Sequence, residues 1–169
     1  MQKVLIEIIC AALIAFFLSP GYGEILNSTL FYNKGVERFK EGDNEKALEL
    51  FLQAAEINDN YALAHYGIGR VYLLHKDKAA EAVKHLKRAV ELDSSFAKGF
   101  FYLGMAQMLA EKYNDSIKSF KKAYEKDIAL HESLYNISVA YDMKGDKLHS
   151  IIYYRKYIKA KEKKDDDIF

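Results

Sequence analysis

Residues 97–130, AKGFFYLGMAQMLAEKYNDSIKSFKKAYEKDIAL, hold a pattern that recurs before and after them. The aromatic residue Phe101 has counterparts 34 or 35 residues apart, at Tyr32, Tyr66 and Tyr135. Small residues recur at the same interval, at Gly35, Gly69 and Gly104 and at Ala54, Ala89 and Ala123. A fixed period of roughly 20 to 50 residues is typical of stacked units, none of which can bury its apolar face alone. The sequence therefore predicts an array of repeats.

Each repeat contains two segments with helical spacing of apolar residues, joined by a turn. In the first repeat, Asn27-Ser28-Thr29 offers N-cap oxygens, and we expect helices over Leu30–Lys40 and Glu45–Ile57. The glycine positions and Ser138 on the first helix, and small residues at positions 47, 82, 116 and 150 on the second, allow the two helices to approach closely. The large residues Phe51, Leu86, Phe120 and Tyr154 are then expected to fill the space between them. The predicted fold class is all-α.

These units resemble tetratricopeptide repeats, helix-turn-helix units of about 34 residues. Four tandem copies cover residues 28–161. The resemblance implies an α-solenoid, a right-handed superhelix of four hairpins, that serves as a non-catalytic protein-interaction scaffold. The fourth copy departs from the pattern, because Ser138 replaces glycine and Tyr157 replaces alanine, and we expect its helices to sit slightly apart. In the first copy, charged residues stand at packing positions (Lys34, Glu37 and Arg38), which suits a repeat with no preceding neighbour.

The resemblance also implies a concave groove, lined by the first helix of each hairpin. Its expected ligand-contacting residues are Tyr32, Val36 and Phe39; Tyr66, Arg70 and Leu73; Phe101, Met105 and Met108; and Tyr135, Val139 and Asp142. An aromatic and apolar groove suits an extended peptide or a helix of a partner protein. We expect the aromatic ladder to be exposed, the alternative being burial against neighbouring repeats. Arg70 and Asp142 are interpreted as ordinary polar rim residues, and a clamp for a terminal carboxylate is not expected.

Other functions lack support in the sequence. The net charge of +1 argues against nucleic-acid binding, which requires a basic face. The five histidines show no helical pair at metal spacing, so we predict no metal site, no cofactor and no catalytic residues. His65 is expected to be a buried structural imidazole. The chain has one cysteine, Cys10, and can therefore form no internal disulfide.

Residues 1–23 differ from the rest of the chain. A positive start at Lys3, an apolar run over Ile8–Leu18 and small residues before Gly23 resemble a cleaved secretory signal peptide. An uncleaved anchor through residues 4–18 is the first alternative, although this stretch is shorter than the roughly 20 residues of a spanning helix. A buried first helix is the second alternative. The prediction is export to a periplasmic or extracellular location, or membrane anchoring with the repeats outside the cytoplasm.

The other end of the array is predicted to lack a cap. Ile151 and Ile158 occupy positions that face the next repeat in earlier copies, but only a charged tail (residues 162–169) follows the repeat domain (residues 24–161). These residues are either partly covered by the tail, simply exposed, or an interface. The leading hypothesis is an extracytoplasmic scaffold that holds a partner's peptide segment in an envelope or secretion assembly. The alternative is a structural homo-oligomer joined through Ile151 and Ile158.

Overall fold

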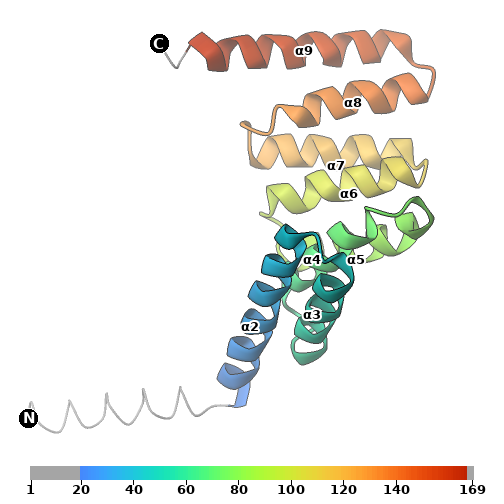
Figure 1. Cartoon of the computed structure of the whole chain (residues 1–169). Coiled ribbons are helices and arrows are strands. Elements are labelled where there is room, and N and C mark those ends of the chain that lie inside the picture. Colours follow the sequence, from blue (N-terminus) through green and yellow to red (C-terminus); the bar gives the residue numbers. More distant parts are fainter. Residues whose placement is uncertain (1–19, 167–169) are drawn as a thin grey trace, which may run out of the picture.

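The computed structural model describes residues 20–166, and side chains over residues 23–162. These residues form helices and no strand. The helices are α2 (Pro20–Glu41), α3 (Asn44–Ile57), α4 (Ala62–Tyr72), α5 (Ala79–Leu92), α6 (Ala97–Leu109), α7 (Tyr113–Lys126), α8 (Glu132–Met143) and α9 (Lys147–Asp166), with a short 3₁₀ turn at Lys76–Lys78 before α5. They form four antiparallel hairpins stacked in chain order, with α2 and α3 at one end and α9 at the other (Figure 1). This arrangement confirms the predicted all-α solenoid.

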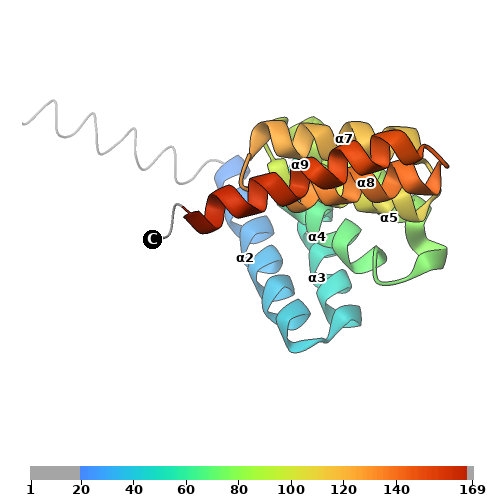
Figure 2. The same cartoon turned by 90° about the horizontal axis from the view of Figure 1, so that it is seen from above.

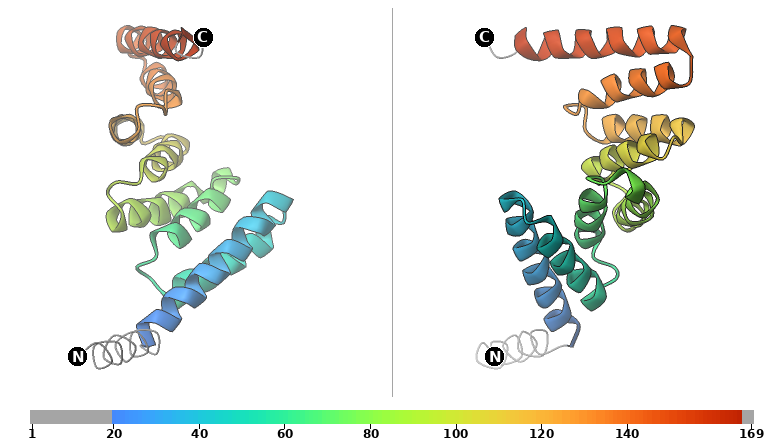
Figure 3. Two further views of the ribbon diagram at one scale, coloured as in Figure 1. Left: turned by 90° about the vertical axis from the view of Figure 1, so that its left-hand side faces the viewer. Right: turned by 45° about the vertical axis from the view of Figure 1, so that its right-hand side comes forward.

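The stack twists along its length. Seen from above, α9 lies across the layer below it, whereas α2 and α3 run in a different direction (Figure 2). The turned views in Figure 3 show the same change of direction between the first hairpin and the last. Each hairpin therefore presents its first helix at a shifted angle, and the inner surface curves.

The third hairpin shows why the helices pair so closely. Gly104 on α6 faces Phe120 on α7, and a Cβ atom at Gly104 would lie only 2.8 Å from the Phe120 ring. Phe120 itself is fully buried, as are its counterpart Leu86 in the second hairpin and the small residue Ala123. The predicted packing of small residues against large ones is confirmed for the first three hairpins, since Phe51 is also buried.

The fourth hairpin departs from this packing, and the prediction that Tyr154 fills the space between its helices is wrong. Ser138 is buried and donates a hydrogen bond to the Tyr135 carbonyl oxygen over 2.7 Å. Tyr154 is 49% exposed, and its ring lies 6.4 Å from that of Tyr135. Two other tyrosines of α9, Tyr153 and Tyr157, lie closer to the rings of α8, at 5.6 Å from Tyr141 and from Tyr135.

Both ends of the array extend further than expected. Helix α2 begins at Pro20, ten residues before Leu30, because proline is tolerated in the first turn of a helix. Helix α9 continues to Asp166, since Ala160, Lys161 and Glu162 all favour helix. The expected start of the first helix is therefore corrected, and the first residues of the charged tail are helical.

The apolar run of the proposed export segment lies outside the described residues, and the proposed cleavage after Gly23 falls within the first turns of α2. Among the helices over residues 20–166, none has the length and apolar character needed to cross a membrane.

His65 is buried, as expected, but the sequence did not indicate its partner. Its Nδ1 lies 3.2 Å from Nδ1 of His85 on α5, and its Nε2 lies 3.0 Å from the Asp59 carbonyl oxygen. Asp59 also accepts a hydrogen bond from Arg88 over 3.0 Å. With both rings neutral, Nε2–H of His65 donates to Asp59 and Nδ1–H of His85 donates to His65. The two imidazoles thus join α4, α5 and the preceding turn.

Candidate binding groove

The aromatic ladder predicted to line the groove is only partly exposed. Tyr32 and Phe101 are half-buried, Tyr66 is 7% exposed and Tyr135 is 44% exposed. The expectation of a uniformly open ladder is therefore wrong for Tyr66, which belongs to the core.

The ladder is partly buried because the last residue of each repeat packs beside the ladder ring of that repeat. Tyr61 lies edge-on to Tyr32 at 5.6 Å between ring centroids. Phe96, at the same position one repeat later, lies edge-on to Tyr66 at 4.8 Å. Leu130 is the next equivalent and lines a hollow with Phe101. The equivalent position of the fourth repeat, residue 164, lies outside the described side chains, and Tyr135 is 44% exposed among residues 23–162.

Arg70 is the most distinctive residue of the concave side. Its guanidinium carbon lies 4.6 Å from the ring centroid of Phe39, 5.4 Å from that of Tyr66 and 5.2 Å from that of Tyr102. These rings come from α2, α4 and α6, so one cation joins three repeats. The interpretation of Arg70 as an ordinary rim residue is therefore wrong. Aromatic faces attract a guanidinium, and the attraction grows as water is removed.

Arg70 has no carboxylate within ion-pairing distance among residues 23–162. The nearby Tyr66 hydroxyl cannot replace one as an anion, because burial raises the pKa of Tyr66 to about 12. A guanidinium carries five N–H donors, and aromatic faces satisfy few of them. The site therefore retains the capacity to bind a carboxylate.

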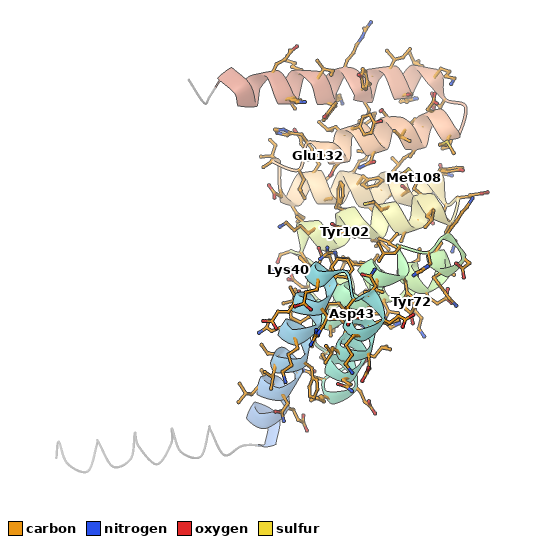
Figure 4. The ribbon with its side chains drawn as sticks, in the orientation of Figure 1. Lys40, Asp43, Tyr72, Tyr102, Met108 and Glu132 are labelled. Atoms are coloured by element: carbon orange, nitrogen blue, oxygen red, sulfur yellow. The ribbon has the colours of Figure 1, made fainter. Side chains whose placement is uncertain are left out.

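A hollow of about 390 Å³ opens beside Arg70. Its lining residues are Tyr66, Arg70, Lys98, Phe101, Tyr102, Leu130 and Glu132. Figure 4 shows Tyr102 at the level where α6 meets the end of α2, and Glu132 at the start of α8. Two cations against one acid give the hollow an excess of positive charge, and the aromatic rings give it apolar walls.

The hollow brings together three of the twelve predicted groove residues, Tyr66, Arg70 and Phe101. Lys98 and Glu132 were missed, although both stand at the second position of their repeats, which the family also uses for ligands. Tyr102 was missed because its position has no aromatic counterpart in the other repeats.

The remaining predicted residues do not line the hollow. Val36 and Phe39 pack beside Phe51, with the Phe39 ring also against Arg70, and Leu73 packs in the core of the second and third repeats. Met105 and Met108 pack against the cluster that contains Phe120 and Ile137, and Figure 4 shows Met108 away from Tyr102. Val139 is half-buried. Asp142 is an exposed rim residue, as expected, and its Oδ1 lies 2.6 Å from Nζ of Lys147.

The outer face of α9 is the second predicted surface. Ile151 is 53% exposed and Ile158 is 36% exposed, so residues up to 162 leave them uncovered. They line a hollow of about 690 Å³ with Ser150, Tyr154, Arg155, Lys159 and Glu162.

The stacked antiparallel hairpins place the protein in the class of helical-repeat solenoids. Two family models place the chain within that class. One described as "TPR repeat" matches residues 35–76, and one described as "Tetratricopeptide repeat" matches residues 62–96 and 131–164. The chain belongs to the tetratricopeptide-repeat family.

A curated relative supports this assignment. The chain is 32% identical over 107 residues to "Tetratricopeptide repeat-containing protein trd-1" of Caenorhabditis elegans. The alignment covers 63% of this chain and 14% of the relative. This chain therefore spans about a seventh of that relative's length.

Two solved structures share the fold. "Crystal structure of MamA" superposes with a TM-score of 0.78 at 21% identity and covers 83% of this chain and 81% of that chain. "First TPR of Spaghetti (RPAP3) bound to HSP90 peptide SRMEEVD" superposes with a TM-score of 0.68 at 17% identity and covers 72% and 95% of the two chains. Similarity at this level of identity shows the common solenoid.

Proposed function

We propose that the protein is a non-catalytic scaffold that binds a segment of a partner protein in the hollow beside Arg70. The observation that carries the proposal is a guanidinium held among three aromatic rings with no carboxylate partner in the described part of the chain. A charge-assisted bond to a carboxylate is stronger than a neutral hydrogen bond, and the surrounding rings reduce competition from water.

The partner segment is best matched by an acidic side chain next to an aromatic or aliphatic one. The acid would bind Arg70, and the apolar neighbour would rest on Phe101 and Tyr102. The acid is an internal Asp or Glu, because a terminal carboxylate clamp requires a cluster of Lys and Asn at the fifth and ninth repeat positions. The peptide bound to the RPAP3 repeat domain is itself rich in acids, which supports a carboxylate ligand for this fold.

The test is capture of a defined partner by variants of the full chain. Arg70→Ala is expected to weaken binding at least about tenfold, because a hydrogen bond to a charged group contributes about 1.5–3 kcal/mol. The matched control is Arg38→Ala, which removes an exposed arginine paired with Glu41 on α2. Equal binding by the wild type and Arg70→Ala, with unchanged helical circular dichroism, would show that the hollow beside Arg70 is not the binding site.

We also propose that the scaffold works outside the cytoplasm, in an envelope or secretion assembly. The support is the sequence of residues 1–23, with its basic start, apolar run and small residues before Gly23. Mass spectrometry of the native protein should find a first residue of Glu24, or an intact first segment in a membrane fraction. An intact chain recovered from the soluble cytoplasm would contradict this placement.

A homo-oligomer joined through α9 is the second candidate, favoured by the exposure of Ile151 and Ile158. Light scattering of the full chain at high micromolar concentration tests it. A strict monomer would reject it.

A further inference from the structure

The outer face of α9 is exposed among the described residues. Tyr153 and Tyr157 lie on the side that meets α8, with Tyr153 stacked on Tyr141 at 5.6 Å and Tyr157 at 5.6 Å from Tyr135. On the opposite side, Leu148 is 69% exposed and Ile152 is 39% exposed. Figure 1 shows α9 as the last layer of the stack, with no described element beyond it.

The same face is covered in every earlier repeat. Val90 on α5 and Ile117 on α7 correspond to Ile158 and Ile151, and both are buried by the following hairpin. The aliphatic residues of α9 therefore form a packing face that no element of residues 20–166 covers. An exposed apolar face of this kind marks a docking surface or an aggregation hazard.

Basic residues are interleaved with the aliphatic ones on this face. Arg155 and Lys159 line the 690 Å³ hollow together with Ile151 and Ile158. Over residues 147–162, α9 carries five cations and a single acid, Glu162. The equivalent helix of the first repeat, α3, carries three glutamates and one lysine. The two ends of the solenoid thus have opposite charge.

The excess of positive charge on α9 indicates what kind of surface would bind this face. Two copies of α9 meeting face to face would bring Arg155 and Lys159 of one copy against those of the other, and like charges disfavour that contact. An anionic bilayer surface satisfies both features, because headgroups accept the cations while the boundary with the acyl chains receives the aliphatic groups. Long basic side chains can bury their stems beside apolar surface and keep their charge among the headgroups.

We propose that α9 docks on an anionic membrane surface, with Leu148, Ile151, Ile152 and Ile158 in the interfacial layer and Arg155 and Lys159 on the headgroups. The surface is separate from the Arg70 hollow and does not depend on the proposed groove ligand. The solenoid would lie with its last repeat against the lipid and its concave side available to a partner.

The absence of tryptophan from the chain makes a direct spectroscopic test available. The full chain with Ile151→Trp is compared with the full chain with Leu52→Trp, which places the same reporter at a 42% exposed aliphatic site on acidic α3. With vesicles of phosphatidylcholine and phosphatidylglycerol, the emission of Ile151→Trp should shift to the blue and resist an aqueous quencher. Pure phosphatidylcholine should produce no shift, and added salt should reverse it.

Charge-reversal variants test whether vesicle binding depends on α9 rather than on another part of the chain. Arg155→Glu with Lys159→Glu should reduce co-sedimentation with the anionic vesicles at least about tenfold, given the contribution of each basic residue near such a surface. The control is Lys118→Glu with Lys126→Glu on α7, which should leave binding within about twofold. All variants keep residues 1–19, so a difference between them belongs to α9.

Three results would overturn the proposal. They are an equal emission shift at positions 52 and 151, an equal loss of binding in the α7 and α9 charge variants, and a wild-type dimer in light scattering that Ile151→Asp converts to a monomer without any vesicle binding.

Discussion

The third and fourth hairpins are copies of one repeat, yet side chains at equivalent positions are packed differently in each. In the third, Gly104 admits Phe120 to the core, where the ring is fully buried. In the fourth, Ser138 occupies the glycine position, and Tyr154 lies 49% exposed. The same repeat position is thus a core position in the third hairpin and a surface position in the fourth.

The concave side shows a parallel difference between interior and terminal repeats. Tyr66 is buried against Phe96 at the end of its own repeat and Tyr102 of the following repeat, whereas Tyr135 is 44% exposed among the described residues. A repeat position therefore has no fixed burial, because its environment includes the next copy. The second and third repeats supply most of the lining of the Arg70 hollow, and the fourth repeat exposes tyrosines and isoleucines among the described residues.

The largest expected difference between the hairpins is in the cost of removing the large residue. Phe120→Ala should destabilise the fold by about 3–5 kcal/mol, because it leaves a cavity between α6 and α7. Tyr154→Ala should cost less than about 1 kcal/mol, since the ring is half in water. Urea unfolding followed by circular dichroism measures both. Similar costs would show that the two positions are packed alike.

Exchanging the small residues sharpens the same comparison. Gly104→Ser should cost about 1–3 kcal/mol, because its Cβ would meet the Phe120 ring at 2.8 Å and the core must move. Ser138→Gly should change stability by less than about 1 kcal/mol, the difference in helix propensity. Thermal unfolding of the two variants provides the measurement. A neutral Gly104→Ser variant would contradict the packing argument.

Acid should weaken the second hairpin and spare the third, whose helices contain no histidine. Burial, followed by the proximity of His65 and Lys84, lowers the pKa of His85 to about 4, below the ordinary histidine value of 6.5. The unfolded chain therefore binds more protons between these pH values, so stability is full above pH 6.5 and falls as the pH drops toward 4.

The measurement for this effect is the urea midpoint of the full chain across that pH range. His85→Gln keeps a polar group beside His65 but cannot titrate, so its midpoint should depend less on pH than that of the wild type. Identical pH profiles would exclude His85 as the origin of the acid sensitivity.

The smallest expected effect is at the turn of the fourth hairpin. Asp142 and Lys147 are both at least half exposed, although Oδ1 and Nζ lie 2.6 Å apart. Asp142→Ala should change the free energy of unfolding by less than about 1 kcal/mol, since exposed ion pairs contribute little. A larger loss, seen by thermal unfolding, would give this turn a structural role that its exposure does not support.

The sequence predicted the features that recur and missed those that depend on a neighbour or on a terminus. The 34-residue spacing was enough to place Gly104 against Phe120, because both partners lie within one repeat. The burial of Tyr66 was missed although Tyr61, Phe96 and Leu130 recur at the position that covers the ladder. The setting of Arg70 could not be predicted, because Phe39, Tyr66 and Tyr102 converge on it from three repeats at unequal positions.

The central claim is that the hollow beside Arg70 and Phe101 holds an acidic segment of a partner protein. A photo-crosslinking benzoylphenylalanine at position 101 tests it most directly in the source cells, with position 52 on α3 as the control site. If the hollow is the binding site, position 101 should give a discrete adduct whose crosslinked peptide contains an Asp or Glu, and Arg70→Ala should abolish it. An adduct that survives Arg70→Ala, or one that forms equally from position 52, would show that the partner binds elsewhere.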